Sequence, residues 1–231
     1  MKICIIALPR TGSQHLAEIF CQAYKNMTDC YEPFTHSEFL YDLELKNNKI
    51  IIVKNKKYVD IQDRITSVCN IIDRSDQTQN LVLRLFLLDY LEKYYTQIFS
   101  CLKRNQFVFY VLRRDKTEQL LSWAIAVASA KWNTNRGYHA NNKYLINDFS
   151  SMTWLYKQIN EFDKRLGTIN CGYNEIHYET IYQDVYKNLA FEPNLKNLLF
   201  KKQIINDHYD YIINADEVRE VIENIKNGKI Y

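Results

Sequence analysis

The start of the chain changes from a short apolar run to a helical pattern of apolar positions. Residues 3–8 (ICIIAL) are all apolar, which predicts a buried strand. Pro9 and Gly12 then interrupt the run, and after Ser13 apolar residues recur on one helical face, at positions 16, 19, 20 and 23. The pattern therefore predicts a strand, a tight loop and a helix that runs from about residue 13 to residue 25.

A second strand, loop and helix pattern begins at residue 107. Residues 107–112 (FVFYVL) have a strong β propensity, and two arginines, Arg113 and Arg114, follow them. Asp115, with a glutamate three positions later, predicts a capped helix that carries Ser122 about two turns in. Because ligands of open parallel sheets bind at the carboxyl ends of the strands, the two arginines are candidate ligand residues. The alternative is that both arginines pair with surface carboxylates and that Ser122 is simply a small helix residue.

Shorter patterns predict the other elements of the chain. Strands are predicted at 49–54 and 81–87, and helices at 60–72, 90–102, 148–166 and 215–227. A further helix that begins at Thr35 or Ser37 would carry Phe39, Leu40 and Leu43. The chain of 231 residues can bury a sizeable core and shows no internal repeat. We predict one α/β domain over residues 1–231, with a short parallel sheet flanked by helices.

Composition narrows the class of partner. Apolar residues make up 47% and charged residues 25% of the chain, as in a soluble globular protein. A net charge of +3 is too small to indicate nucleic acid, but it fits a local basic pocket for an anion. The six cysteines form no C-x-x-C pair, which favours free thiols in a reducing, cytoplasmic setting. The apolar run at the start is too short for a signal peptide or a membrane span.

The loop over residues 9–13 (PRTGS) has the chemistry of an anion site. Its backbone N–H groups and the positive end of the following helix would point at one spot, which suits phosphate or sulfate. Arg10 adds a fixed positive charge, and Thr11 and Ser13 add hydroxyl donors. The nucleoside-triphosphate loop and the dinucleotide fingerprint are both absent, since Gly12 is the only glycine here. The alternative is an ordinary turn that requires a glycine.

Two motifs resemble those of one enzyme family. Pro9-Arg10-Thr11-Gly12-Ser13 resembles the 5′-phosphosulfate loop of sulfotransferases that use 3′-phosphoadenylyl sulfate (PAPS). Arg114 and Ser122 resemble, in residue type and in their spacing of eight positions, the pair that binds the 3′-phosphate in that family. The arginine in the loop looks most like the bacterial nodulation-factor and trehalose sulfotransferases, and the string RRDKTEQLLSW resembles the trehalose-type enzymes.

The same family supplies a hypothesis for the base. Tyr31-Glu32-Pro33-Phe34 resembles a segment in carbohydrate sulfotransferases whose carboxylate takes the proton of the acceptor. Because it precedes a proline, Glu32 is predicted in extended or turn backbone. His36 is a second titratable candidate, and a plain surface carboxylate is the alternative for Glu32. Residues 175–181 (EIHYETI) resemble a late strand end of the family, in which His177 would be structural.

The resemblance implies a reaction and a set of roles. A P-loop-like domain, related to nucleotide kinases, would transfer a sulfuryl group from PAPS to a small-molecule or carbohydrate hydroxyl, without a metal. Arg10 would stabilise the leaving phosphate, Arg114 and Ser122 would hold the 3′-phosphate, and Glu32 or His36 would take the proton. Thr11, Gly12, Ser13 and Gln14 would hold the 5′ side of the donor. We expect no nucleic-acid partner and no transmembrane segment, and a homodimer remains open.

Two alternatives come from other functional classes. A small-molecule kinase would share the fold, but it would need the missing Lys-[Ser/Thr] loop and a carboxylate for Mg²⁺. A non-catalytic nucleotide-binding module would keep Arg114 and Ser122, while Glu32 would prove dispensable. The sequence does not identify the acceptor, and a sugar or glycolipid hydroxyl is favoured only by the resemblance.

Overall fold

The structure is a computed structural model that describes residues 1–35, 41–54, 60–130, 142–188 and 208–229. The chain forms two compact units, residues 1–113 with 162–198, and residues 114–161 with 199–231. The first unit holds a parallel sheet, and the described part of the second unit is mainly helical.

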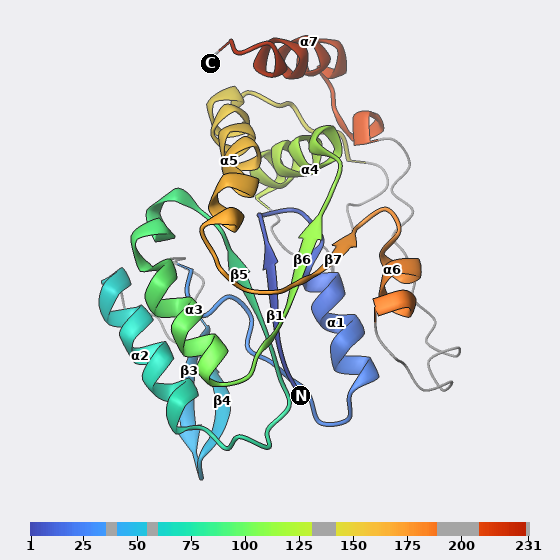
Figure 1. Ribbon diagram of the computed structural model, residues 1–231. Coiled ribbons are helices and arrows are strands. Elements are labelled where there is room, and N and C mark those ends of the chain that lie inside the picture. The colour runs from blue at the N-terminus through green and yellow to red at the C-terminus, as the bar shows by residue number, and fades with distance from the viewer. Residues whose placement is uncertain (36–40, 55–59, 131–141, 189–207, 230–231) are drawn as a thin grey trace. The chain divides into compact units, whose positions relative to one another are not determined.

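A five-stranded parallel sheet organises the first unit, in the order β2-β5-β1-β6-β7 (Figure 1). Its strands are β1 (Lys2–Ala7), β2 (Thr28–Asp29), β5 (Leu81–Phe86), β6 (Val108–Arg113) and β7 (Asn174–His177). The helical elements described in this unit are α1 (Ser13–Ala23), α2 (Ile61–Arg74), the 3₁₀ helix η1 (Asp89–Tyr94), α3 (Tyr95–Arg104), the end of α5 (Phe149–Gly167) and α6 (Ile181–Asn188). Every residue of β1 is buried, as expected for the central strand of a parallel sheet.

Helices cover both faces of this sheet. Phe20 of α1 packs on Tyr110 of β6 with ring centroids 5.1 Å apart, and Phe99 of α3 packs on Phe109, 5.6 Å away. Because successive residues of a strand point to opposite faces, α1 and α3 lie on opposite faces of the sheet. Figure 1 shows α2 beside α3. The predicted α/β class, a short parallel sheet flanked by helices, is confirmed.

The strand order creates a switch point next to β1. From β1 the chain passes through α1 to β2 at one edge of the sheet, whereas β6 is followed in the sheet by β7 at the other edge. Neighbouring strands whose connections diverge leave a crevice at their carboxyl ends, where open α/β sheets bind ligands. The loop over residues 8–12 leaves β1 at this edge, and Arg113 ends β6 there.

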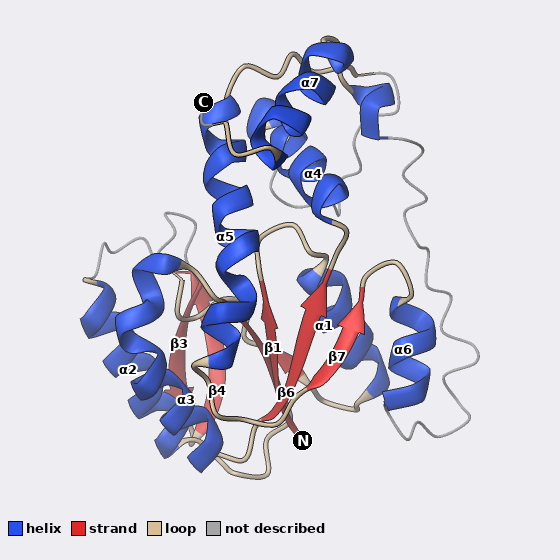
Figure 2. Cartoon of the chain, turned by 45° about the horizontal axis from the view of Figure 1, so that its top comes forward, coloured by secondary structure: helices blue, strands red, loops and turns tan. Residues whose placement is uncertain are grey.

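A hairpin replaces one of the predicted helices. β3 (Tyr41–Lys46) pairs antiparallel with β4 (Lys49–Lys54), and Figure 2 shows both as strands. Leu43, which was predicted on a helix, lies in β3 opposite Ile52. Asn47 and Asn48 connect the strands with φ angles of 52° and 60°, as a two-residue type I′ turn requires. The helix prediction is therefore wrong at Leu43, and its residues 36–40 lie outside the described part of the chain.

The remaining predictions for the first unit hold with small changes. β4, β5 and α2 confirm the strands predicted at 49–54 and 81–87 and the helix predicted at 60–72. The helix predicted at 90–102 is divided into η1 and α3. Residues 175–181 contain the end of β7 and then the start of α6, a helix that the sequence analysis did not predict.

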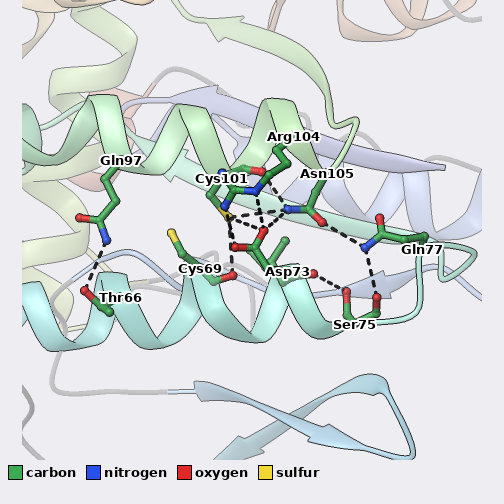
Figure 3. Close-up of polar contacts among 10 residues, drawn as sticks. Thr66, Cys69, Asp73, Ser75, Gln77, Gln97, Cys101, Arg104 and Asn105 are labelled. Atoms are coloured by element: carbon green, nitrogen blue, oxygen red, sulfur yellow. Dashed lines mark hydrogen bonds and ion pairs between the residues drawn. The ribbon is translucent and has the colours of Figure 1, made fainter.

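A polar cluster joins α2 to α3 (Figure 3). The Asp73 carboxylate accepts hydrogen bonds from Nε and Nη2 of Arg104, at 3.1 and 2.6 Å, and from Nδ2 of Asn105 at 2.6 Å. Asn105 Nδ2 also donates to the Cys101 carbonyl at 2.9 Å, and Cys101 Sγ donates to the Cys69 carbonyl at 3.7 Å. The hydrogen bonds to the carboxylate itself, above all those from Arg104, hold the pKa of Asp73 below its usual value.

The second unit is built around α4 (Lys116–Ser129), the first part of α5 (Phe149–Gly167), the 3₁₀ helix η4 (His208–Tyr211) and α7 (Ala215–Lys226). Asp115 Oδ1 accepts a hydrogen bond from the Glu118 N–H at 3.0 Å, which confirms the predicted cap of α4. The Glu118 carboxylate lies 2.6 Å from Nδ1 of buried His208 and so joins α4 to η4. Trp123 packs on Trp154 of α5, with ring centroids 5.5 Å apart.

Replacing Asp73 by Asn should lower the free energy of unfolding by about 1 kcal/mol at pH 7, because a charge-assisted cluster is lost at a partly exposed site. The pKa of Asp73 is lowered in the folded state, so its stabilising effect is present above the unfolded pKa of about 4 and disappears as pH falls. Urea unfolding between pH 7 and pH 3 measures both effects. Asp63→Asn, at an exposed position of α2, is the control. An equal loss of stability in this control, or a loss in Asp73→Asn that does not depend on pH, would contradict the role of Asp73.

Candidate functional site

The loop after β1 turns the chain from the centre of the sheet into α1. Thr11 is 2% exposed, and its Oγ1 donates a hydrogen bond to the Leu8 carbonyl at 2.8 Å. Arg10 and Gly12 both have left-handed backbone, with φ angles of 65° and 90°. A left-handed arginine costs about 1–2 kcal/mol, so the surrounding structure must hold this conformation.

Gly12 is needed for two reasons. Its φ angle of 90° is readily adopted only by glycine, and a Cβ at this position would lie 2.3 Å from ring atoms of Tyr178. Tyr178 follows β7, and its N–H donates to the Arg113 carbonyl at 2.8 Å, which extends the pairing of β6 with β7 by one bond. The ring of Tyr178 therefore lies against the loop, a contact that no sequence pattern indicated.

The loop ends at the amino terminus of α1. Gly12, the N-cap residue, has no side chain to cap the helix, and the first turn carries no acidic residue. The Leu16 N–H donates to the Gly12 carbonyl at 3.1 Å, so the N–H groups of residues 13–15 precede the first helical hydrogen bond. Gln14 Nε2 donates to Glu18, so Gln14 would meet an anion through its backbone. This geometry suits an anion at the positive end of the helix dipole.

Glu32 lies at the same edge of the sheet as the loop. It follows β2, which is separated from β1 by β5 alone, and the Thr35 N–H donates to its carbonyl at 3.1 Å. The predicted turn backbone is therefore present. Glu32 Oε1 lies 3.2 Å from Arg84 Nη1, and the side chain is 32% exposed. Burial raises the pKa of Glu32 and Asp29 raises it further, while Arg84 opposes both. Glu32 is thus a partly buried, ion-paired carboxylate.

The partner of Glu32 is Arg84, a residue that was not predicted at the site. Arg84 lies within β5, is 4% exposed and also approaches Asp29, with 3.7 Å between Nη2 and Oδ2. One feature of the sequence indicated a buried ion pair here: Arg84 is the single charged residue of an otherwise apolar strand (LVLRLF). Arginine is almost never fully buried unless it is paired. The position of the carboxylates depends on tertiary structure and could not be read from that strand.

The two arginines after the predicted strand have different surroundings. Arg113 Nε lies 2.8 Å from Glu175 Oε2, and Nη2 lies 2.7 Å from Asp163 Oδ1, so Arg113 is part of an ion-pair network of the first unit. Arg114 and Ser122 belong to the second unit, where Arg114 precedes the N-cap of α4 and Ser122 is 2% exposed within that helix. Their role at a 3′-phosphate stays a prediction.

Several other expectations concern groups away from the loop. His36 lies outside the described residues. Among the described residues, no group of three His, Cys, Asp or Glu side chains could hold a metal ion. No helix in this part of the chain has the length and apolar character needed to cross a bilayer. All six cysteines are free, and four of them are buried: Cys4, Cys30, Cys69 and Cys101.

Comparison with known proteins gives little further information. No family model and no curated protein matches the chain. Among solved structures, the chain is similar to the crystal structure of mouse sulfotransferase SULT7A1 complexed with PAP, with a TM-score of 0.38 and 12% sequence identity. The match covers 97% of this chain but 63% of that one, so the chain spans less than two thirds of its length. A similarity at this level carries no argument for a shared activity.

Proposed function

We propose that this protein transfers a sulfuryl group from PAPS to a hydroxyl group of a small-molecule or carbohydrate acceptor. The observation that carries the proposal is the loop over residues 8–13, at the carboxyl end of the central strand. It combines a left-handed Arg10, a left-handed Gly12 and the start of α1 at a switch point of the sheet. This combination supports binding of a phosphosulfate anion.

The loop would hold the 5′ end of the donor. The backbone N–H groups of residues 12–14 and the Ser13 hydroxyl would contact the phosphosulfate. Thr11 would contribute its N–H, because its hydroxyl donates to the Leu8 carbonyl. The Arg10 guanidinium would balance the negative charge that grows on the bridging oxygen in the transition state. Charge stabilisation and in-line positioning are the main requirements of such a transfer.

The 3′-phosphate would be held by Arg114 and Ser122. Arg113 is already bound to Asp163 and Glu175, which favours its neighbour as the ligand. A guanidinium presents forked donors that match phosphate oxygens, and a hydroxyl adds one further donor.

Glu32 would act as the general base. The acceptor oxygen attacks sulfur while the proton of the hydroxyl passes to the Glu32 carboxylate. The bond between sulfur and the phosphate oxygen breaks, and adenosine 3′,5′-bisphosphate leaves with the electron pair. The partial burial of Glu32, its ion pair and its place at the carboxyl edge support this role. His36 remains the second candidate for the same step.

Arg114→Ala should weaken binding of adenosine 3′,5′-bisphosphate by about 1.5–3 kcal/mol, the scale of a hydrogen bond to a charged group. Binding of adenosine 5′-phosphate, which lacks the 3′-phosphate, should hardly change. Calorimetry measures both, with Arg219→Ala in α7 as a control that removes another arginine of the same unit. Unchanged affinity for the bisphosphate in Arg114→Ala would contradict the assignment.

Glu32→Gln should lower kcat by about 10²–10⁴-fold, the usual contribution of a general base, and leave the affinity for adenosine 3′,5′-bisphosphate nearly unchanged. A sulfuryl-transfer assay with labelled PAPS and a set of acceptors measures the rate. Glu44→Gln, at an exposed position of β3, controls for loss of a carboxylate. If Glu32→Gln is active and His36→Asn is not, the base is His36.

Chelation separates this proposal from the kinase alternative. Turnover with PAPS should survive excess EDTA, because Arg10 and the helix terminus supply the positive charge. Turnover that is lost with EDTA and restored by Mg²⁺, with ATP as the productive donor, would instead indicate a kinase.

A further inference from the structure

Arg84 is a buried charge in the parallel sheet. Its neighbours in β5, Leu83 and Leu85, are 1% and 0% exposed, and its own side chain is 5% exposed. Its Cα lies opposite that of Ile5 in the central strand. Moving a guanidinium out of water costs several kcal/mol, which is offset only when the charge is well paired. The partners of Arg84 therefore show what this charge does in the fold.

Four contacts join Arg84 to residues 29–32, which lead out of β2. Nη1 lies 3.2 Å from Glu32 Oε1, and Nη2 lies 3.7 Å from Asp29 Oδ2. The guanidinium carbon lies 5.3 Å from the centre of the Tyr31 ring. The backbone N–H of Arg84 donates to the Tyr31 carbonyl at 2.7 Å. One arginine thus contacts both carboxylates and a residue between them.

The backbone of this segment is held in an unfavourable conformation. Tyr31 has a φ angle of 56°, and its N–H donates to Asp29 Oδ1 at 2.8 Å. A left-handed residue other than glycine costs about 1–2 kcal/mol and persists where surrounding contacts fix it. Here the contacts come from Asp29 and Arg84. These two residues therefore fix the backbone conformation of Tyr31 and, with it, the position of Glu32, the next residue.

We propose that Arg84 is a positioning residue, which fixes the Glu32 carboxylate at the carboxyl edge of the sheet and keeps it ionised for proton transfer. The inference rests on the proposed function, in which Glu32 accepts the proton of the acceptor hydroxyl. The ion pair uses Oε1, and a carboxylate has a second oxygen, Oε2, whose lone pairs can accept that proton. Arg84 acts through Glu32 and not on the substrate.

The charges around Glu32 determine how it titrates. Burial raises the pKa of Glu32, Arg84 lowers it and Asp29 raises it. Two groups of α1 interact with the partners of Glu32. The charge of Glu18 raises the pKa of Asp29, and Cys21 interacts electrostatically with Asp29 and Arg84. Burial raises the pKa of Cys21 to about 11, so its thiol is neutral at pH 7. Without Arg84, the carboxylate of Asp29 would still act on Glu32, and the pKa of Glu32 would rise further.

Carbon-13 NMR titration of the Glu32 carboxyl, identified by its absence in Glu32→Gln, tests this without turnover. Arg84→Gln should move the titration midpoint to higher pH, and Arg84→Lys, which keeps the charge, should move it less. Asp29→Asn keeps the acceptor for the Tyr31 N–H and should move the midpoint to lower pH. A midpoint that stays unmoved in both Arg84→Gln and Asp29→Asn would overturn the proposal.

Arg64 of α2 provides a matched control. It is 5% exposed, its Nε donates to the Pro33 carbonyl at 2.7 Å, and its Nη1 lies 3.1 Å from Asp42 Oδ1. Arg64→Gln therefore removes a second buried arginine that holds the residue next to Glu32, and it should leave the titration of Glu32 in place. A shift as large as that in Arg84→Gln would indicate a general loosening of the turn and overturn the proposal.

The pH profile of turnover adds a catalytic readout. In Arg84→Gln the acidic limb of kcat/KM should move to higher pH, which lowers the rate on that limb about 10-fold for each pH unit of displacement. The KM for PAPS should change little. A rate reduced equally at every pH would reflect damage to the fold and overturn the proposal. If the wild type transfers no sulfuryl group, the proposed function is wrong, and the NMR titration still decides whether Arg84 controls Glu32.

Discussion

The burial of β1 at the centre of the parallel sheet is the constraint on which the first unit depends. Strands on both sides and helices on both faces surround β1, so the chain can present polar groups only where the strand ends. There it turns onto the face covered by α1 through two left-handed residues, Arg10 and Gly12. The turn places Arg10 and the amino terminus of α1 at the carboxyl edge of the sheet.

The sheet contains two arginines that are each bound by two carboxylates, and their solvent exposure separates their roles. The partners of Arg113, Asp163 and Glu175, have side chains that are 71% and 38% exposed. The partners of Arg84, Asp29 and Glu32, are 19% and 32% exposed. Water screens the first network more strongly, so a charge change there has a smaller effect. Removal of one charge should therefore change the pKa of a neighbouring carboxylate more among Arg84, Asp29 and Glu32 than among Arg113, Asp163 and Glu175.

The sequence predicts the parts of this fold that depend on local pattern. The apolar run of β1, the helical spacing after Ser13 and the cap at Asp115 are encoded within a few residues, and each was predicted correctly. The hairpin was missed because apolar residues near Leu43 fit a helix as well as a strand until β4 is known as their partner. The turn at Asn47 and Asn48 was the local signal for it.

The candidate site was predictable to a similar extent. The loop and the turn at Glu32 follow from short motifs, whereas the contact of Tyr178 with Gly12 joins residues far apart in the sequence. The same is true of Arg84, whose partners come from the segment after β2. Composition and spacing indicate which residues are unusual. They do not indicate which of them meet, because packing of the sheet and of α1 determines that.

The proposed function depends most on the loop after β1, which would bind the 5′ end of a nucleotide donor. Amide chemical shifts in nitrogen-15 NMR test it most directly, with adenosine 3′,5′-bisphosphate as the probe. We expect the amide signals of Gly12, Ser13 and Gln14 to shift progressively with ligand concentration, because their N–H groups would donate to the 5′-phosphate. Binding that shifts amides elsewhere and leaves these three unchanged would contradict it.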